Sequence, residues 1–313
     1  IVTDESFMDH TRLLLGLDIG GTKCAALVGD ENGAILDRRE WPSNASRGPE
    51  PMIADLLREA RALMNVHHGV VACGVSIGGP LDAKQGVILS PPNLPGWDQI
   101  PLREQLSAAL SLPVRVEHDA AACAVAEYRW GAARGASPAC YLTCGTGFGV
   151  GILFGGVPHY GAGGNTCEIG HVRYRIDGPT AFGKQGSFEA YCAGSSLSRL
   201  AAWRFPQRWS TPPSGPELSA LAQSGDADAD EVLAISARAV GDACALLADL
   251  LVPEVIVLGS LATYLGQPWI TRVRSAFEAE ALPSAAGACR IVPSALGRRL
   301  QDCSALAAAS LAI

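Results

Sequence analysis

The chain has 313 residues, of which 48% are hydrophobic and 18% are charged, a composition typical of a compact folded protein. At this length a chain buries a large core, and two domains are expected. The net charge of −7 argues against nucleic acid or an anionic membrane as the main partner. Since the sequence has no run of about 18 apolar residues, we expect no membrane-spanning helix.

Ten cysteines are spread along the sequence without a Cys-x-x-Cys pair, most of them in apolar or alanine-rich stretches. This pattern favours reduced thiols in the core of a cytoplasmic protein over a disulfide framework. Residues 1–12 also lack the basic, apolar and cleavage segments of a secretory signal.

The first half of the chain alternates predicted strands and helices. A meander of three strands comes first, and its expected strands lie near 13–18, 23–29 and 34–40. It is followed by a helix at 51–65, a buried strand at 70–77, a helix at 101–110, a short strand at 114–116 and an alanine-rich helix at 120–130.

The second half repeats this order. A hairpin over 139–154 leads into glycine-rich and loop-like segments, and a Pro- and Ser-rich stretch at 206–215 is expected to be exposed. The remaining predicted elements are helices at 195–205, 227–250, 268–281 and 302–313 and a strand at 255–258. Two α/β domains facing a cleft are expected.

Two glycine-rich hairpins carry the strongest chemical signal. The first contains Asp18-Ile19-Gly20-Gly21-Thr22-Lys23 and the second Gly145-Thr146-Gly147-Phe148-Gly149, each between apolar strands. Turns without β-carbons let backbone N–H groups approach phosphate oxygens, and Thr adds a hydroxyl donor. Asp18 is of the type that holds a metal-bound water beside phosphates. One such hairpin commonly only reverses the chain, but the pair indicates a duplicated fold that binds nucleotide phosphates.

Further motifs, in the expected order, carry a family resemblance. They are Gly78-Gly79-Pro80, the segment from Pro92 to Trp97, His118-Asp119 and Glu168-Ile169-Gly170-His171. With the hairpins, they make residues from about 13 to 313 resemble the ROK family of sugar kinases. The resemblance implies an α/β, two-domain, actin-like ATPase (ribonuclease H-like) fold with a nucleotide and sugar cleft between the domains. We expect domains at 12–117 and 118–300, with a helix at 301–313 packing back on the first.

The resemblance also implies ATP and Mg²⁺ as cofactors. It assigns the phosphates to both hairpins and the adenosine to the turn after the strand at 255–258; the residues are Gly20, Gly21, Thr22, Lys23, Gly145, Thr146, Gly147, Gly259 and Ser260. Asp18 would hold Mg²⁺ through water. Two alternatives stay open: Lys23 as a solvated strand residue, and Gly259-Ser260 as an ordinary strand-to-helix turn.

Asp119 is the expected catalytic base. It follows a short strand and precedes the alanine-rich helix, so the helix N-terminus favours its ionised form. An ionised Asp accepts the proton of a sugar hydroxyl as that oxygen attacks the γ-phosphorus. The alternative role is a helix N-cap.

Sugar binding requires polar groups that converge on ring hydroxyls. The resemblance places such groups at Gly78, Gly79, Asn93, His118, Asp119, Glu168, His171 and Glu189. Taken one at a time, Asn93 also fits a turn residue and Glu189 a solvated helix start.

Two positions depart from the family pattern. His118 stands where the family usually has Asn, so sugar specificity cannot be copied from glucokinases. The family's three zinc-binding cysteines are replaced by Thr180, Phe182 and Ser187, which leaves His171 as one ligand where structural zinc needs four. We therefore expect no zinc, a loop held by packing of Phe182, and a His171 free to bind sugar.

These observations predict an ATP-dependent kinase for a primary hydroxyl of a hexose, glucose first, with no nucleic acid or membrane partner and a homodimeric state. Mannose, fructose, allose, an N-acyl amino sugar and a cyclitol remain open as substrates. A sugar-responsive regulator is the rival, but it needs a DNA-binding module before the first hairpin. A non-catalytic sugar sensor is the other alternative, which turnover of ATP with a sugar panel distinguishes.

Overall fold

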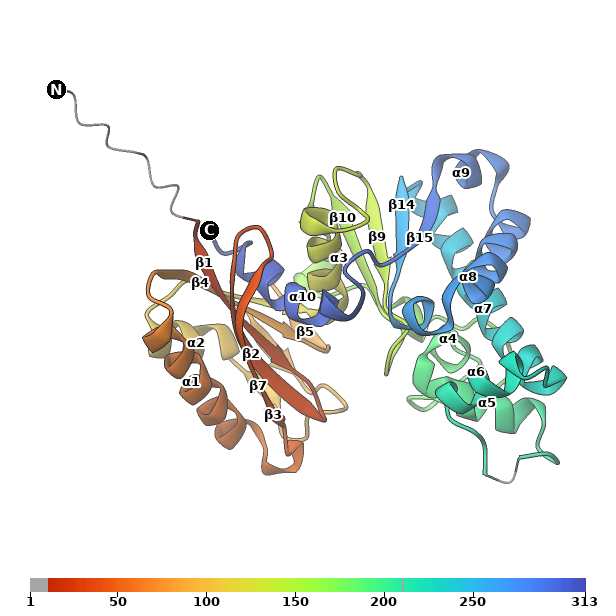
Figure 1. Ribbon diagram of the computed structural model, residues 1–313, viewed down its shortest axis with the longest axis horizontal. Helices are drawn as coiled ribbons and strands as arrows, with labels where there is room; N and C mark the ends of the chain where they lie inside the picture. Colours follow the sequence, from red (N-terminus) through yellow and green to blue (C-terminus); the bar gives the residue numbers. More distant parts are fainter. Residues whose placement is uncertain (1–10, 210) are drawn as a thin grey trace. The chain divides into compact units, whose positions relative to one another are not determined.

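The computed structural model describes residues 11–209 and 211–313 as a mixed α/β protein (Figure 1). By its internal contacts the chain divides into two units. The first unit ends at His118 and also takes in Gln301–Ile313, whereas the second is Asp119–Leu300. Among the described residues, no helix is long and apolar enough to cross a membrane.

The first unit is built on a five-stranded sheet. Its strand order is β3 (Ile35–Pro42), β2 (Lys23–Asp30), β1 (Leu13–Ile19), β4 (Val70–Ile77) and β8 (Val114–His118). The first three strands form the predicted meander and are antiparallel, and β1, β4 and β8 are parallel. One face is covered by α1 (Pro49–Val66) and α2 (Leu102–Leu110) and the other by α10 (Leu300–Ala309) (Figure 1).

Two glycines let α10 lie close to the centre of this sheet. Gly16 of β1 and Gly74 of β4 are paired in register. A β-carbon on Gly16 would lie 2.9 Å from the β-carbon of Ala305, and one on Gly74 would overlap the backbone of α10 at Ala309. Strand glycines without side chains therefore make room for the alanine-rich helix.

A small antiparallel sheet of short strands lies in the same unit. It consists of β5 (Leu81–Asp82), β6 (Val87–Leu89) and β7 (Asp98–Ile100), which the sequence did not predict. Trp97, just before β7, is fully buried. A 3₁₀ turn, η1 (Ala45–Arg47), precedes α1.

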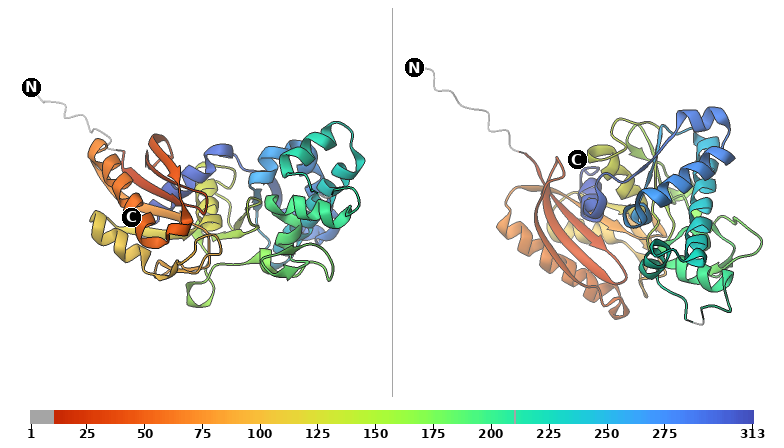
Figure 2. Two further views of the ribbon diagram at one scale, coloured as in Figure 1. Left: turned by 90° about the horizontal axis from the view of Figure 1, so that it is seen from below. Right: turned by 45° about the vertical axis from the view of Figure 1, so that its right-hand side comes forward.

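The second unit repeats the arrangement of the first sheet. Its strand order is β11 (Val157–Pro158), β10 (Val150–Phe154), β9 (Ala139–Leu142), β14 (Val255–Leu258) and β15 (Arg290–Pro293). The first three strands are antiparallel, and β9, β14 and β15 are parallel. One face carries α3 (Asp119–Trp130) and the other α7 (Ala227–Leu251) and α8 (Ser260–Glu280), which lie side by side (Figure 2).

A long segment between β11 and α7 holds short elements. They are η2 (Ala162–Gly164), η3 (Ile169–His171), β12 (Thr180–Ala181), β13 (Lys184–Gln185), α4 (Phe188–Cys192), η4 (Gly194–Ser196), α5 (Leu197–Arg204) and α6 (Gly215–Gln223). Two more, α9 (Pro283–Ala288) and η5 (Gly297–Arg299), flank β15.

Most predicted elements agree with the structure to within a few residues, but one predicted helix has a different start and one helix, α6, was not predicted. The helix predicted at 268–281 begins earlier, at Ser260, and is kinked at Gly266, whose φ is 69°. The segment at 206–215 was expected to be an exposed excursion, and α6 begins at its end with a complete capping box at Ser214 and Glu217.

All ten cysteines are free thiols, and nine of them are buried, whereas Cys167 is half-buried. Burial raises the pKa of Cys73, Cys140 and Cys144 to about 12. These thiols are therefore protonated at neutral pH and act as small apolar core residues.

Candidate functional site

Three strand ends line up at one edge of the first sheet. Ile19 pairs with Ile77, and Ile77 pairs with His118, so β1, β4 and β8 end in register. The turn of the first hairpin follows β1, Gly78-Gly79 follows β4, and Asp119 follows β8. Open α/β sheets bind ligands outside the carboxyl ends of their parallel strands, where these three predicted segments lie.

The turn of the first hairpin is held by backbone and side-chain hydrogen bonds. The Gly20 N–H donates to the Lys23 carbonyl over 3.0 Å. Ser43 donates its hydroxyl to the Gly21 carbonyl over 2.7 Å and its N–H to the Thr22 carbonyl over 3.0 Å. The Gly20 amide is thus committed to closing the turn. Gly20 can therefore contribute to a phosphate site only by lacking a side chain, which lets a phosphate approach the backbone closely.

Asp18 lies at the end of β1 with only 7% of its surface exposed. Its Oδ1 accepts a hydrogen bond of 3.0 Å from Nε2 of Gln301, the second residue of α10. Sequence reasoning missed Gln301, and no local signal points to it, because the two residues are 283 positions apart.

Lys23 is engaged at the surface. Its Nζ lies 2.9 Å from Oε2 of Glu40, and that carboxylate also pairs with Arg38. The side chain of Lys23 is exposed. This contact agrees with the alternative that Lys23 is a solvated strand residue.

The sugar candidates of the first unit lie around the same edge. Asn93 is exposed and packs against the first hairpin, since a β-carbon on Gly21 would lie 2.9 Å from the Asn93 β-carbon. A β-carbon on Gly78 would meet nothing within 4 Å, so this backbone borders open space. His118 is buried, with 5% exposure.

The strand that leads to Asp119 is anchored by a buried acid. Glu117 is fully buried, accepts the His118 N–H over 3.1 Å, and pairs with Arg115 at 3.1 Å. Asp119 itself is half-buried at the start of α3, where its Oδ1 accepts the Ala120 N–H over 2.6 Å. This bond places the carboxylate at the N-terminus of α3, and both the catalytic role and the N-cap alternative stay predictions.

The second hairpin is braced by a serine that sequence reasoning missed. Its turn is closed by the Gly145 N–H donating to the Gly147 carbonyl over 3.1 Å. Ser195 donates its N–H to the Gly145 carbonyl over 3.2 Å and its hydroxyl to the Thr146 carbonyl over 2.5 Å. The only sequence signal was a small residue after Gly194.

Gly259 and Ser260 lie beside the second hairpin. Gly259 follows β14 and donates its N–H to the Leu142 carbonyl of β9 over 2.8 Å. A β-carbon on Gly145 would lie 3.4 Å from Oγ of Ser260. The predicted phosphate and adenosine residues of the second unit are therefore neighbours.

Three predicted sugar residues lie on the segment after this hairpin. Glu189, at the start of α4, is half-buried, and its Oε2 accepts the Phe148 N–H over 3.1 Å. Burial raises the pKa of Glu189, and the Phe148 N–H partly opposes that effect. Glu168 and His171 are exposed, and Glu168 accepts a hydrogen bond of 3.3 Å from Thr166.

The loop at 174–188 is held by aromatic packing, but Phe182 does not contribute as expected. That prediction is wrong: Phe182 is 55% exposed at the tip of the β12–β13 hairpin, with a φ of 42°. Instead the rings of Tyr174 and Phe188 stack at 4.8 Å, and the Tyr174 hydroxyl donates to Asp242 over 2.6 Å. Ser187 caps α4.

The metal-ligand chemistry of this loop does not fit zinc. Thr180, Phe182 and Ser187 offer no thiolate or imidazole, and His171 alone does not complete a four-ligand site. Across residues 11–209 and 211–313, no group of three or more His, Cys, Asp or Glu side chains is arranged to hold a metal ion.

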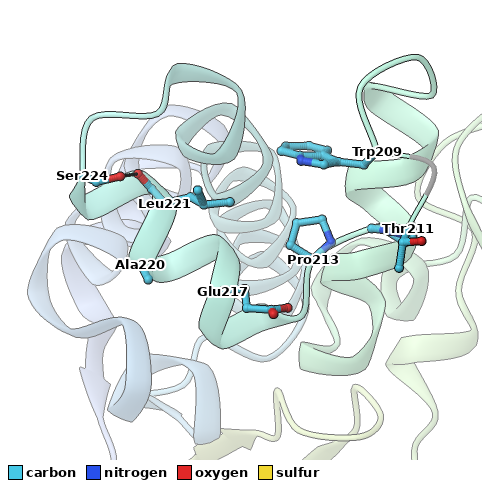
Figure 3. Close-up of a pocket in the computed structure, with 8 residues that line it drawn as sticks. Trp209, Thr211, Pro213, Glu217, Ala220, Leu221 and Ser224 are labelled. Carbon is cyan, nitrogen blue, oxygen red and sulfur yellow. Dashed lines mark hydrogen bonds between the residues drawn. The ribbon is translucent and has the colours of Figure 1, made fainter.

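The second unit also has a surface hollow. It has a volume of about 580 Å³ and is lined by Trp209, Thr211, Pro212, Pro213, Glu217, Ala220, Leu221 and Ser224. Trp209 and Leu221 face one another across it (Figure 3). None of the predicted site residues lines it.

Comparison with known proteins identifies the family. Residues 14–313 match the model of the ROK family. The chain belongs to the ROK family. This ROK protein is 35% identical over 261 residues to a glucokinase of Streptomyces coelicolor, covering 79% of this chain and 81% of the relative.

Two solved ROK structures share its fold. A ROK hexokinase of Thermus thermophilus has a TM-score of 0.83 and 32% identity, covering 96% of this chain and 98% of the other. A glucokinase of Streptomyces griseus, in complex with glucose and AMPPNP, has a TM-score of 0.79 and 31% identity, with the same coverage. The predicted family and the predicted α/β, actin-like fold class are confirmed.

Proposed function

We propose that this ROK protein transfers the γ-phosphoryl group of ATP to a primary hydroxyl of a hexose, with glucose as the first acceptor to test. Its similarity to glucokinases and to a hexokinase supports an ATP-dependent sugar kinase, as the sequence predicted. The finer assignments rest on one observation. The first hairpin, Gly78-Gly79 and Asp119 all follow the carboxyl ends of three strands that end in register.

In the proposed reaction, the Asp119 carboxylate takes the proton of the sugar hydroxyl as that oxygen bonds to the γ-phosphorus. The bond from the γ-phosphorus to the bridging oxygen breaks, and ADP leaves with the electron pair. Asn93, Glu168, His171 and Glu189 bind and orient the ring hydroxyls, together with His118 and the backbone at Gly78-Gly79.

The residues present fit a nucleotide with Mg²⁺. Asp18 is a buried carboxylate oriented by Gln301, and a β-carbon on Gly20 would lie 2.9 Å from the Lys23 carbonyl, so the turn is a tight backbone cradle. When bound, Mg²⁺ neutralises charge on the phosphates. We assign Asp18 to the water shell of that ion. Gly21, Thr22, Thr146 and Gly147 are assigned to the phosphates, and Gly259 and Ser260 to the adenosine. No zinc is required.

The test is Asp119→Asn, which keeps the side-chain size and the oxygen that accepts the Ala120 N–H. We expect turnover with glucose to fall by about 100-fold or more, while the glucose Kd from calorimetry stays within about threefold. Turnover close to wild type would exclude Asp119 as the base. Failure of the wild-type protein to phosphorylate any sugar in a panel of hexoses, amino sugars and cyclitols would instead favour a sugar sensor.

A further inference from the structure

In the second unit, one candidate sugar residue is bonded directly to the candidate phosphate hairpin. Oε2 of Glu189 accepts the N–H of Phe148, at the tip of that hairpin, over 3.1 Å. The same oxygen would lie 3.0 Å from a β-carbon on Gly147. The carboxylate therefore lies directly against the hairpin.

The segment Glu168-Ile169-Gly170-His171 packs against both partners of this contact. A β-carbon on Gly170 would overlap the carbonyl oxygen of Phe148 and lie 3.4 Å from the β-carbon of Glu189. Gly170 is buried between Glu168 and His171, which are both sugar candidates. Three segments, the hairpin tip, the loop at 168–171 and the start of α4, thus pack on one another without intervening side chains.

The first unit shows the same relationship with different residues. A β-carbon on Gly21, in the first hairpin, would lie 2.7 Å from the carbonyl oxygen of Asn93 and 2.9 Å from its β-carbon. Asn93 is the sugar candidate of that loop. In each unit, therefore, a residue assigned to the sugar touches the hairpin assigned to the phosphates.

We infer that Glu189 and Asn93 couple sugar binding to nucleotide binding, each by fixing the phosphate hairpin of its own unit. The inference rests on the proposed function. A sugar hydroxyl that donates to Glu189 fixes the carboxylate, and the carboxylate fixes the Phe148 N–H and the hairpin behind it. Nucleotide phosphates then meet backbone groups that are already ordered, so the entropy cost of their binding falls. Glu189 is thus both a sugar ligand and a positioning residue for the hairpin.

The experiment measures how much sugar tightens nucleotide binding. The Kd of Mg²⁺·AMPPNP is determined by calorimetry without glucose and at saturating glucose, and the ratio of the two is the coupling factor. For the wild-type protein we expect a factor of at least about 5, within the range typical of coupled sites. By thermodynamic reciprocity, AMPPNP must tighten glucose binding by the same factor.

Two glycine variants break the contacts without removing a sugar ligand. Gly147→Ala adds a β-carbon 3.0 Å from Oε2 of Glu189 and is expected to weaken its bond to the Phe148 N–H, and Gly21→Ala adds one 2.7 Å from the Asn93 carbonyl oxygen and is expected to shift that loop. For each we expect the coupling factor to fall below about half of the wild-type value, because an ordered hairpin no longer follows sugar binding. Gly287→Ala on α9 is the matched control, since its β-carbon would meet nothing within 4 Å and Gly287 is assigned to neither ligand, so the factor should stay unchanged.

Glu189→Gln separates the two roles of this residue. Glutamine keeps a carbonyl oxygen for the Phe148 N–H but loses the charge, so glucose binding should weaken while the coupling factor persists. A wild-type factor near 1, or an unchanged factor in both Gly147→Ala and Gly21→Ala, overturns the inference. Those outcomes leave the proposed function standing if the wild-type protein still phosphorylates glucose; absence of sugar turnover would overturn that function instead.

Discussion

The sheets of the two units have the same topology, but the acidic residue that accompanies each glycine hairpin comes from a different element. Each sheet has three antiparallel strands continued by two parallel ones, and each places a glycine hairpin between its first two sequential strands. In the first unit an acid, Asp18, is part of the hairpin strand itself and is oriented by α10. In the second unit the acid, Glu189, comes from a later helix and binds the hairpin backbone.

This difference suits the two carboxylates to different roles, one beside a metal ion and one beside a sugar. A carboxylate on the strand lies at a fixed place beside the turn, which suits a metal-bound water. A carboxylate from the segment between β11 and α7 reaches the hairpin from outside, and that segment also carries Glu168 and His171. The comparison therefore predicts that the acid of the first unit serves the metal ion, whereas the acid of the second unit serves sugar recognition.

The largest expected effect tests the acid of the first unit. Asp18→Asn should lower kcat with Mg²⁺·ATP by about 100-fold or more, because charge stabilisation at a transferring phosphoryl group is lost. The control is Asp30→Asn, at the far end of the same strand pair, where the side chain accepts turn N–H groups of Asn32 and Ala34. Equal activities of the two variants would remove the metal role from Asp18.

The next effect concerns specificity at the edge of the first sheet. His118→Asn restores the amide that the family usually has, and it should change the relative kcat/KM of sugar epimers by about 5- to 150-fold. The ATP KM should stay nearly constant, since His118 is not assigned to the nucleotide. An unchanged ranking of all sugars tested would mean that the buried ring packs away from the substrate.

A smaller effect is expected where α10 meets Asp18. Gln301→Ala removes one hydrogen bond to a carboxylate and should raise the Mg²⁺ concentration for half-maximal activity by about tenfold. Gln301→Glu places a like charge 3.0 Å from Asp18 and should be worse than alanine. If glutamate is tolerated as well as alanine, Gln301 acts through packing and does not position Asp18.

The smallest effect separates aromatic packing from metal binding in the second unit. Tyr174→Phe should lower the Tm by about 2–4 °C, since loss of the hydrogen bond to Asp242 costs about 1 kcal/mol. Tyr264→Phe is the control, because that side chain is 69% exposed. Zinc chelation should leave both Tm and activity unchanged, and one tightly bound zinc per chain by elemental analysis would refute the packing explanation.

The sequence was informative where chemistry is local. Glycine and threonine between apolar strands predicted both hairpins, and apolar runs predicted the strands at 70–77 and 255–258, which have the same bounds in the structure. The three strands of the small sheet are too short for any periodicity. The helix predicted to begin at 268 begins at Ser260, and the kink at Gly266 lies just before the predicted start.

Sequence patterns could not predict contacts between residues that are far apart in the chain. Gln301 on Asp18 and Ser195 on the second hairpin depend on how elements pack, and neither residue belongs to a motif. The prediction that Phe182 packs the loop was wrong for a related reason. Its apolar side chain suggested burial, but its position at the tip of a hairpin exposes it. Tyr174, which carries the packing, bears a hydroxyl that finds its partner 68 residues away.

Because α10 packs on a sheet formed by residues before 119, the first unit can finish folding only after α10 has been synthesised. The sheet of the first unit is complete once β8 has left the ribosome, but the face that carries Gly16 and Gly74 packs against α10, the helix that begins at Leu300. Until then the nascent chain exposes an apolar sheet face, which favours association with chaperones or aggregation. Translational pausing before residue 300, or C-terminal truncation, is therefore expected to affect the yield of the first unit more than that of the second.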